Sequence, residues 1–366
     1  MKRLIIGDIH GCYTELQELL SKAGVTLSDE IIALGDIVDR GPDSPQVLEF
    51  FRGRPNTRSI IGNHERKHVR SFAGEVRPAL SQRITRRQIG EAHYASACEF
   101  MDSLDRFIEL PEAILVHGFF EPGVPLAEQR ETVIVGTLSG KHYLEKYYEG
   151  EWYKLYDGEK PLIVGHLDYL HTGQPLIWND RVFCIDTGCC YGGALTGLLL
   201  PDFHILSVQS RGDHWREARR KYADIAYQAT ADTDLSWDKV EALIRSLAGQ
   251  AELSQEQGER LSRLSRMLKE AEHLLRILHD RIVQENGRTL ASLRAQCAFD
   301  ELSSADQGRL YAARIGKTPL GTLLHRARKG ALDLAGLRAK FKKPKDLEAL
   351  ATRIGLINGA KDDGTK

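Results

Sequence analysis

The first part of the chain alternates short apolar runs with segments in which apolar residues recur at helical spacing. The apolar runs predict buried strands at residues 4–6, 31–34, 59–61, 113–116, 162–164 and 182–185. Helical spacing follows the first two runs, at residues 13–24 and 44–51. Alternation of strand and helix is typical of parallel strands that carry helices on the faces of the sheet. The sequence therefore predicts an α/β domain.

The pattern changes after residue 210, where strand signals almost disappear. Long stretches with apolar residues three and four apart predict helices at residues 215–227, 237–247 and 252–285. The 366 residues also exceed the roughly 250 to 300 that one core usually serves. We therefore expect an α/β domain over residues 1–210 and a helical domain of unassigned role over residues 211–366. An aromatic-rich insertion at about 119–160 is expected to form a cap on the first domain.

Charge is distributed unevenly along the chain, although the net charge is only −1. Residues 1–210 hold 21 basic and 29 acidic side chains, whereas residues 211–366 hold 29 basic and 22 acidic ones. The basic excess lies after residue 300, where 14 basic side chains face 7 acidic ones. Such a region is more often the solvated surface of a helical bundle than a contact for nucleic acid or protein, and both interpretations stay open.

Composition excludes several classes of protein. No stretch approaches the 18 or so apolar residues that a membrane helix needs, and the apolar start of the chain ends at Gly7 and Asp8. The six cysteines include no C-x-x-C pair. These features lead us to expect a reduced, cytoplasmic protein without membrane contact.

Polar residues follow the predicted strands, in glycine-flanked motifs. The first three strands are followed by Gly-Asp8-Ile-His10-Gly, by Gly-Asp36-Ile-Val-Asp39-Arg40-Gly and by Gly-Asn63-His64-Glu65, and the later strands are followed by His117, His166 and Asp186. The carboxyl ends of parallel strands meet at one edge of a sheet, so we expect a single shared site. Nitrogen and oxygen ligands without thiolate suit Mn, Fe, Zn, Co or Ni.

These motifs resemble a known family. GDIHG, GDIVDRG and GNHE, in this order, are similar to the three signature motifs of the calcineurin-like metallophosphoesterases, in the phosphoprotein phosphatase branch. Residues 185–198 resemble the bacterial diadenosine tetraphosphatases. The resemblance covers about residues 3–208 and implies a four-layer sandwich. Two positions depart from the pattern: His117 is followed by Gly-Phe, and Ile61 stands where many eukaryotic relatives have arginine.

The resemblance also implies roles for the site residues. Two divalent cations, manganese first among them, would be bound: one by Asp8 and His10, the other by Asn63, His117 and His166, with Asp36 bridging both. The family mechanism is in-line attack on phosphorus by a hydroxide that bridges the metals. His64 would be the general acid, Asp39 would accept its other N–H, and Arg40 would bind phosphate oxygens.

The substrate stays open at this level. The resemblance favours a bacterial phosphatase of the Ser/Thr-phosphatase or diadenosine-tetraphosphatase kind, which would act on a phosphoprotein or a nucleotide. One alternative is an RNA 2′- or 3′-end phosphatase. Another is a regulatory module whose basic C-terminal region recruits nucleic acid or protein.

Several residues outside these motifs have ordinary structural interpretations. His68 is expected at the solvated surface, because histidine is often exposed there. For Asp186 a turn and a catalytic role are equally favoured. Arg83, Arg86 and Arg87 are expected on a solvated face. Trp152 and Tyr156, one helical turn apart, are expected to pack the cap rather than to stack on a nucleobase.

Overall fold

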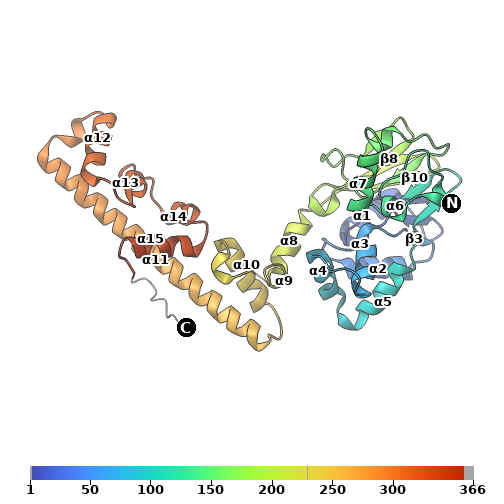
Figure 1. The fold of residues 1–366 in the computed structure, drawn as a ribbon, viewed down its shortest axis with the longest axis horizontal. Helices are drawn as coiled ribbons and strands as arrows, with labels where there is room; N and C mark the ends of the chain where they lie inside the picture. The colour runs from blue at the N-terminus through green and yellow to red at the C-terminus, as the bar shows by residue number, and fades with distance from the viewer. Residues whose placement is uncertain (1, 229, 358–366) are drawn as a thin grey trace. The chain divides into compact units, whose positions relative to one another are not determined.

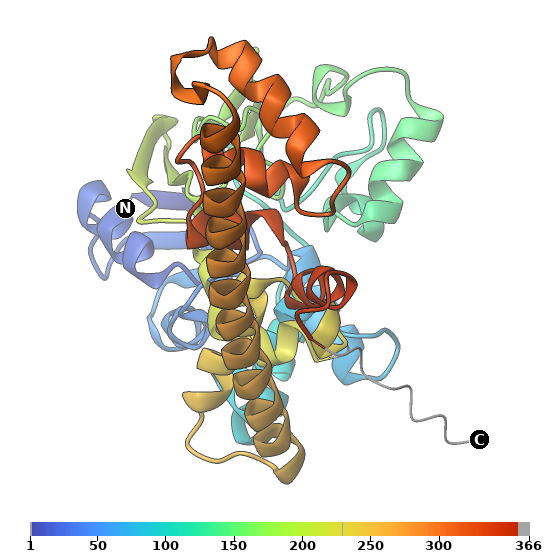
Figure 2. The ribbon, with the colours of Figure 1, turned by 90° about the vertical axis from the view of Figure 1, so that its left-hand side faces the viewer.

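The chain forms two compact units, Met1–Ala226 and Tyr227–Lys366. The computed structural model describes residues 2–228 and 230–357, and its ribbon is drawn in Figures 1 and 2. The division falls beyond residue 210 because the short helices α8 (His214–Lys221) and α9 (Ala223–Ala226) pack on the first unit. His214 Nε2 donates to Glu15 Oε1 at 2.7 Å, which ties α8 to that unit.

The first sheet has the order β11-β10-β1-β2-β3, with β9 paired to β10. Its strands are β1 (Arg3–Ile6), β2 (Glu30–Ala33), β3 (Thr57–Ser59), β9 (Asp186–Thr187), β10 (Ala194–Leu200) and β11 (His204–Gln209). The strands β1, β2 and β3 run parallel, whereas β10 and β11 are antiparallel additions. The three parallel strands therefore bring the segments that follow them to the same edge.

The second sheet has the order β4-β5-β6-β8-β7. Its strands are β4 (Phe107–Glu109), β5 (Ile114–Val116), β6 (Leu162–Val164), β7 (Leu176–Trp178) and β8 (Val182–Cys184). The central strands β5, β6 and β8 are parallel, and both edge strands are antiparallel. The segments that follow β5, β6 and β8 therefore also share an edge.

The two sheets form the middle layers of a sandwich, as the alternation of side chains on β1 shows. Leu4 and Ile6 pack with the helices α1 (Tyr13–Ala23), α2 (Ser44–Gly53) and α5 (Glu91–Asp102), whereas Ile5 packs with Leu115 of the second sheet. A further core lies on the other face of the second sheet. Helices, sheet, sheet and cap are thus the layers, and the predicted α/β sandwich is confirmed.

The cap between β5 and β6 is built from short helices. They are η1 (Leu126–Glu128), α6 (Glu131–Ile134), α7 (Leu138–Tyr147) and η2 (Trp152–Lys154). Trp152 is buried and its ring lies 6.1 Å from that of Phe119, while the ring of Tyr156 lies 5.3 Å from that of Phe120. Trp152 also shares a core with Val116 and Val164 of the second sheet, and Tyr156 packs against that core, so the packing interpretation of both residues is confirmed.

The second unit is entirely helical within residues 230–357. Its elements are η4 (Asp232–Asp234), α10 (Trp237–Ala248), α11 (Gln255–Gln296), η5 (Phe299–Glu301), α12 (Ser304–Ile315), α13 (Gly321–Arg328), α14 (Leu334–Lys340) and α15 (Pro344–Arg353). The 42-residue α11 is the long helix of Figure 2, and the shorter helices bury their apolar faces against it. In the described part of the chain, none of the helices has the length and apolar character needed to cross a membrane.

Candidate active site

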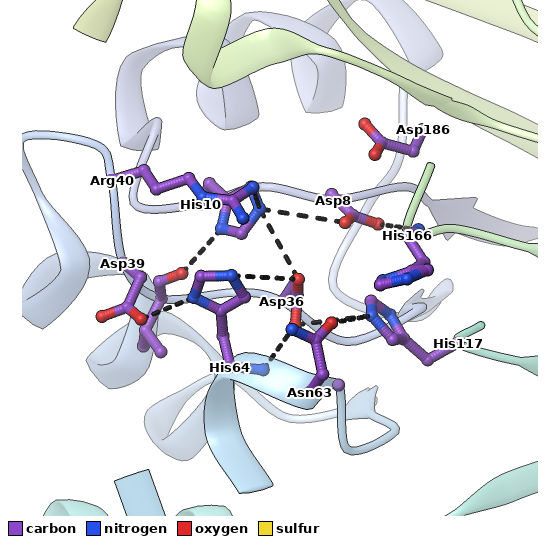
Figure 3. Close-up of polar contacts among 12 residues, drawn as sticks. Asp8, His10, Asp36, Asp39, Arg40, Asn63, His64, His117, His166 and Asp186 are labelled. Atoms are coloured by element: carbon purple, nitrogen blue, oxygen red, sulfur yellow. Dashed lines mark hydrogen bonds and ion pairs between the residues drawn. The ribbon is translucent and has the colours of Figure 1, made fainter. Parts of the chain in front are cut away.

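The predicted site residues come together at the carboxyl edges of the two sheets (Figure 3). Asp8 follows β1, Asp36 follows β2, and Asn63 begins α3 (Asn63–Phe72) just beyond β3. His117 and His166 come from the second sheet, after β5 and β6. Five of the site residues hold the sparsely populated left-handed backbone conformation: His10, Asp36, Asp39, Arg40 and His166. Strain of this kind is typical of functional sites.

Backbone carbonyls fix the tautomers of two histidines. His10 Nδ1 donates to Val38 O at 2.8 Å, and His117 Nδ1 donates to Leu34 O at 2.7 Å. Burial lowers the pKa of both imidazoles, which favours their neutral forms. A neutral ring that donates from Nδ1 carries a lone pair at Nε2. Each Nε2 atom therefore carries the lone pair that a metal ligand needs.

Acceptor atoms face one another around Asp36. The Nε2 atom of His117 lies 3.1 Å from Asn63 Oδ1 and 3.4 Å from Asp36 Oδ1. On the other side, His10 Nε2 lies 3.6 Å from Asp36 Oδ2 and also accepts from Arg40 Nη1 at 2.8 Å. With Nδ1 of His117 already donating, the Asn63, Asp36 and His117 atoms have no proton to share. The partial negative charges of these atoms therefore repel one another, and a cation bound between them would attract all three.

Two buried polar atoms next to this group have no hydrogen-bond partner in the described structure, Asp8 Oδ2 and His166 Nδ1. The other oxygen of Asp8 accepts the backbone N–H of His166 at 2.8 Å, which holds the two residues side by side. Burial, followed by the charges of Asp186 and Asp36, raises the pKa of Asp8 well above its usual value. Burial lowers the pKa of His166 to about 3.

The donor set fits divalent cations of the transition series. It combines carboxylate, imidazole and amide ligands without thiolate, and the unpartnered atoms of Asp8 and His166 point to missing ligands. The groups His10, Asp36 and His64, and Asp36, His117 and His166, each bring their ligand atoms within 4.8 Å of one another. Asp36 is common to both groups, as a bridging ligand would be. A third group, Cys12, Glu15 and His214, is already accounted for by the bond between His214 and Glu15.

His64 and Asp39 form a second part of the site. His64 Nδ1 donates to Asp39 Oδ2 at 2.5 Å, and its Nε2 lies 3.9 Å from Asp36 Oδ2. Asp39 is fully buried, and the charges of His68 and the hydrogen bond from His64 outweigh burial and lower its pKa well below the usual value. The carboxylate is therefore ionised, and it holds His64 with Nε2 directed toward the metal-binding group.

The structure corrects the expectation for His68, which is fully buried rather than solvated. Its Nε2 donates to Asp39 Oδ1 at 2.9 Å, and its Nδ1 contacts Tyr94 Oη at 2.8 Å. His68 lies just over one turn beyond His64 on α3, so both rings face Asp39, and α5 covers them with Tyr94. The general tendency of histidine to be exposed was the wrong guide here.

Two further residues support the site and were not predicted. Gln82, from α4 (Leu80–Ile89), donates from Nε2 to Asp39 Oδ2. Glu65 is fully buried and accepts the backbone N–H of Asp36 at 2.8 Å, of Gly62 at 2.9 Å and of Val38 at 3.2 Å. It therefore fixes the loops that carry Asp36 and Asn63. Its place three residues after Gly62 is a helix-capping signal that could have revealed this role.

The arginines expected on a solvated face are partly engaged. Arg86 pairs with Glu91 at 2.6 Å while remaining largely exposed, and Arg87 bonds Asp224 of α9 at 3.2 Å. Asp186 Oδ1 accepts the backbone N–H of Gly188 at 3.0 Å, which is the turn that the sequence favoured equally with a catalytic role. Burial raises the pKa of Asp186 to about 6, and its carboxyl lies beside Asp8 in Figure 3.

Comparison with known proteins gives a consistent result. The model of the family described as calcineurin-like phosphoesterase matches residues 1–229. The bis(5′-nucleosyl)-tetraphosphatase PrpE (asymmetrical) of Bacillus velezensis is 28% identical over 249 residues, which are 58% of this chain and 98% of that protein. The PrpE protein of Oceanobacillus iheyensis is 30% identical over 239 residues, covering 58% of this chain and 93% of its own.

A solved structure, provisionally identified as a diadenosine tetraphosphatase, is also similar to the chain. It is 25% identical, has a TM-score of 0.48 and covers 57% of this chain and 93% of that one.

Proposed function

The chain belongs to the calcineurin-like phosphoesterase family, whose members use divalent metal ions, and on this premise we propose that it hydrolyses dinucleoside polyphosphates. The observation that carries the proposal is the cluster of acceptor atoms around Asp36, which bound cations would stabilise. The names of the PrpE relatives support a nucleotide substrate. The broader activity, metal-dependent phosphoester hydrolysis, follows from the family.

The proposed metal ligands divide into two sets that share Asp36. Asp8 and His10 complete the first set, and Asn63, His117 and His166 complete the second. When bound, two divalent cations supply Lewis-acid polarisation of the phosphoryl group and activation of water. The oxygen and nitrogen ligands suit Mn, Fe, Zn, Co or Ni. Among these metals we propose manganese, as the family resemblance implies.

The side chain of His64 holds and delivers the proton that the leaving oxygen needs. Asp39 accepts from Nδ1 and fixes the orientation of the ring, so the proton to be transferred lies at Nε2, on the side of Asp36. His68 and Gln82 donate to the two oxygens of Asp39 and prevent its carboxylate from rotating. Together these contacts aim His64 at the leaving group.

Arg40 provides the fixed positive charge of the site. Its pKa is raised above the usual value despite burial, chiefly because the Cys190 and Tyr191 side chains and Asp36 favour the charged form. A guanidinium offers forked donors that match two oxygens of a phosphate. We assign to Arg40 the orientation of the phosphoryl group for displacement.

The alternative in which the basic C-terminal region recruits nucleic acid gains no support from the second unit. Arg338 is bonded to Glu241, and Lys345 Nζ lies 2.6 Å from Asp234. Partners of opposite charge on the same unit reduce the positive field that a phosphate backbone would require. An RNA-end phosphatase likewise has no observation of its own in its favour.

A substrate panel tests the proposal. Purified protein with Mn²⁺ should convert diadenosine tetraphosphate to ATP and AMP faster than it hydrolyses p-nitrophenyl phosphate, a phosphopeptide or RNA ends bearing 2′- or 3′-phosphate. Faster hydrolysis of the phosphopeptide or of the RNA ends would overturn the nucleotide substrate. Inactivity toward the whole panel with Mn²⁺, Fe²⁺, Co²⁺, Ni²⁺ and Zn²⁺ would overturn the enzymatic proposal altogether.

A further inference from the structure

A cavity of about 720 Å³ adjoins the site and shares Arg40, His166 and Asp186 with it. Its volume lies in the range of small-molecule sites, roughly 300 to 1,000 Å³. The rest of its wall comes from the loop after β6, from the turn η3 (Cys189–Tyr191) with the glycines that flank it, and from Gln209 at the end of β11. The geometry points to a nucleoside subsite here, with the base against Tyr191 and the ribose hydroxyls at Asp168 and Asp186. This inference rests on the proposed function, because the phosphoryl group is taken to lie at Arg40.

Tyr191 provides an aromatic surface for a flat ligand. Its side chain is 52% exposed although it lines the cavity, and the Arg40 guanidinium carbon lies 5.3 Å from its ring centroid. Gly173, Gly192 and Gly193 form the neighbouring wall, where no side chains stand in the way of a planar ring. Nucleobases stack on aromatic side chains in such settings.

The two carboxylates of the cavity have acceptor capacity left over. Asp168 Oδ1 accepts the backbone N–H of His171 at 2.8 Å, and Asp186 Oδ1 accepts that of Gly188 at 3.0 Å. No hydrogen bond within the described residues reaches the second oxygen of either group. These oxygens can each accept a hydrogen bond, and the 2′- and 3′-hydroxyls of a ribose offer two adjacent donors. In dinucleotide-binding sites, carboxylates bind ribose hydroxyls in this way.

The negative charge of the cavity disfavours ligands that are themselves negatively charged. Two carboxylates oppose one guanidinium, so a polyphosphate chain or an acidic phosphopeptide would meet repulsion beyond Arg40. A nucleoside is neutral, offers hydroxyl donors and carries a flat ring. It is the part of a dinucleoside polyphosphate that matches this wall.

Competition measurements test the subsite. AMP, ribose 5-phosphate and inorganic phosphate are compared as inhibitors of p-nitrophenyl phosphate hydrolysis by the Mn²⁺-loaded protein. AMP should inhibit at least about fivefold more tightly than either of the others, since stacking a base contributes about 1 to 3 kcal/mol. Tyr191→Leu should remove most of this preference and Tyr191→Phe should keep it. The matched control is Tyr147→Leu, on α7 and outside the cavity, which should leave the preference for AMP unchanged.

The ribose contact has its own variant. Asp168→Asn should weaken the inhibition by AMP several-fold and leave the inhibition by 2′,3′-dideoxyadenosine monophosphate unchanged. Adenosine binding to chelated protein, followed by calorimetry, provides a readout that needs no turnover and should disappear in Tyr191→Leu.

The outcomes separate the two proposals. Equal inhibition by AMP and phosphate in an active enzyme would overturn the subsite and leave the hydrolase intact. A wild-type protein that hydrolyses nothing would overturn the proposed function, while adenosine binding would still decide the subsite. Equal loss of AMP and phosphate binding in Tyr191→Leu would mean that Tyr191 acts only by supporting Arg40.

Discussion

The two units differ in what they bury. The second unit buries a core of apolar and aromatic side chains around α11, and among its described residues no charged side chain is buried. The first unit buries Asp8, His10, Asp36, Asp39 and Glu65 within one region. Burying a charge is costly unless it is paired, so a cluster of this kind indicates that another requirement outweighs stability.

Backbone conformation gives the same contrast. All of the described non-glycine residues with positive φ belong to the first unit, and half of them are site residues. The second unit follows the ordinary rules of a helical bundle, whereas the first breaks them where strands end. Local departures from those rules are typical of functional sites. The functional region of the chain therefore lies where the backbone and the burial of charge depart from these rules, and four substitutions test this difference between the units.

Asp36→Asn should have the largest effect. Removing one negative charge from the shared ligand should lower turnover by about 10³-fold or more, because the metal contribution is several kcal/mol. Metal content measured by mass spectrometry should fall with it. Asp280→Asn, an exposed acid on α11 of the second unit, is the matched control and should change neither quantity. Full activity in Asp36→Asn would show that Asp36 is not the bridging ligand.

His64→Ala should come next, with turnover reduced by about 10² to 10⁴-fold and metal content retained. The loss should be greatest for substrates with poor leaving groups, because these depend most on a proton from His64. The measurement is the slope of log kcat against leaving-group pKa. An unchanged slope would remove His64 from the role of general acid.

His68→Ala should reduce turnover about tenfold, an effect in the range of residues that orient a catalytic side chain. If His68 acts only by holding Asp39 and His64, the same substitution made in the His64→Ala protein should have no further effect on the rate. A double-mutant cycle measures this coupling. Additive losses would show that His68 has a general structural role instead.

Leu278→Ala should have the smallest effect on turnover. Leu278 is fully buried in the core of the second unit, and its truncation should cost that unit about 2 to 5 kcal/mol of unfolding free energy. Denaturation followed by the helical circular dichroism signal measures the loss. If kcat of the folded protein fell in parallel, the second unit would contribute to the site and the contrast between the units would fail.

Much of the fold and of the site was predictable because strands and their ends leave strong local signals. Asp8, Asp36 and His117 each follow an apolar run, and parallel pairing brings such residues to one edge. His68 and Gln82 could not be placed in this way. Their contacts with Asp39 depend on how α3, α4 and α5 pack together, and no spacing within the chain encodes that packing.

The boundary between the units illustrates the same limit. Strand signals end near residue 210, and the helical pattern begins directly after it. The structure nevertheless assigns α8 and α9 to the first unit, where His214 bonds Glu15 and Asp224 bonds Arg87. Periodicity identifies a helix, but long-range contacts decide which core it joins.

We propose that the buried polar cluster of the first unit is a metal-dependent hydrolytic site. The most direct measurement is a titration of chelated protein with Mn²⁺ while hydrolysis of diadenosine tetraphosphate is followed. Activity should be absent before the titration and should rise to a plateau as two equivalents bind. Full activity in the chelated protein would show that hydrolysis does not depend on a metal bound to this cluster.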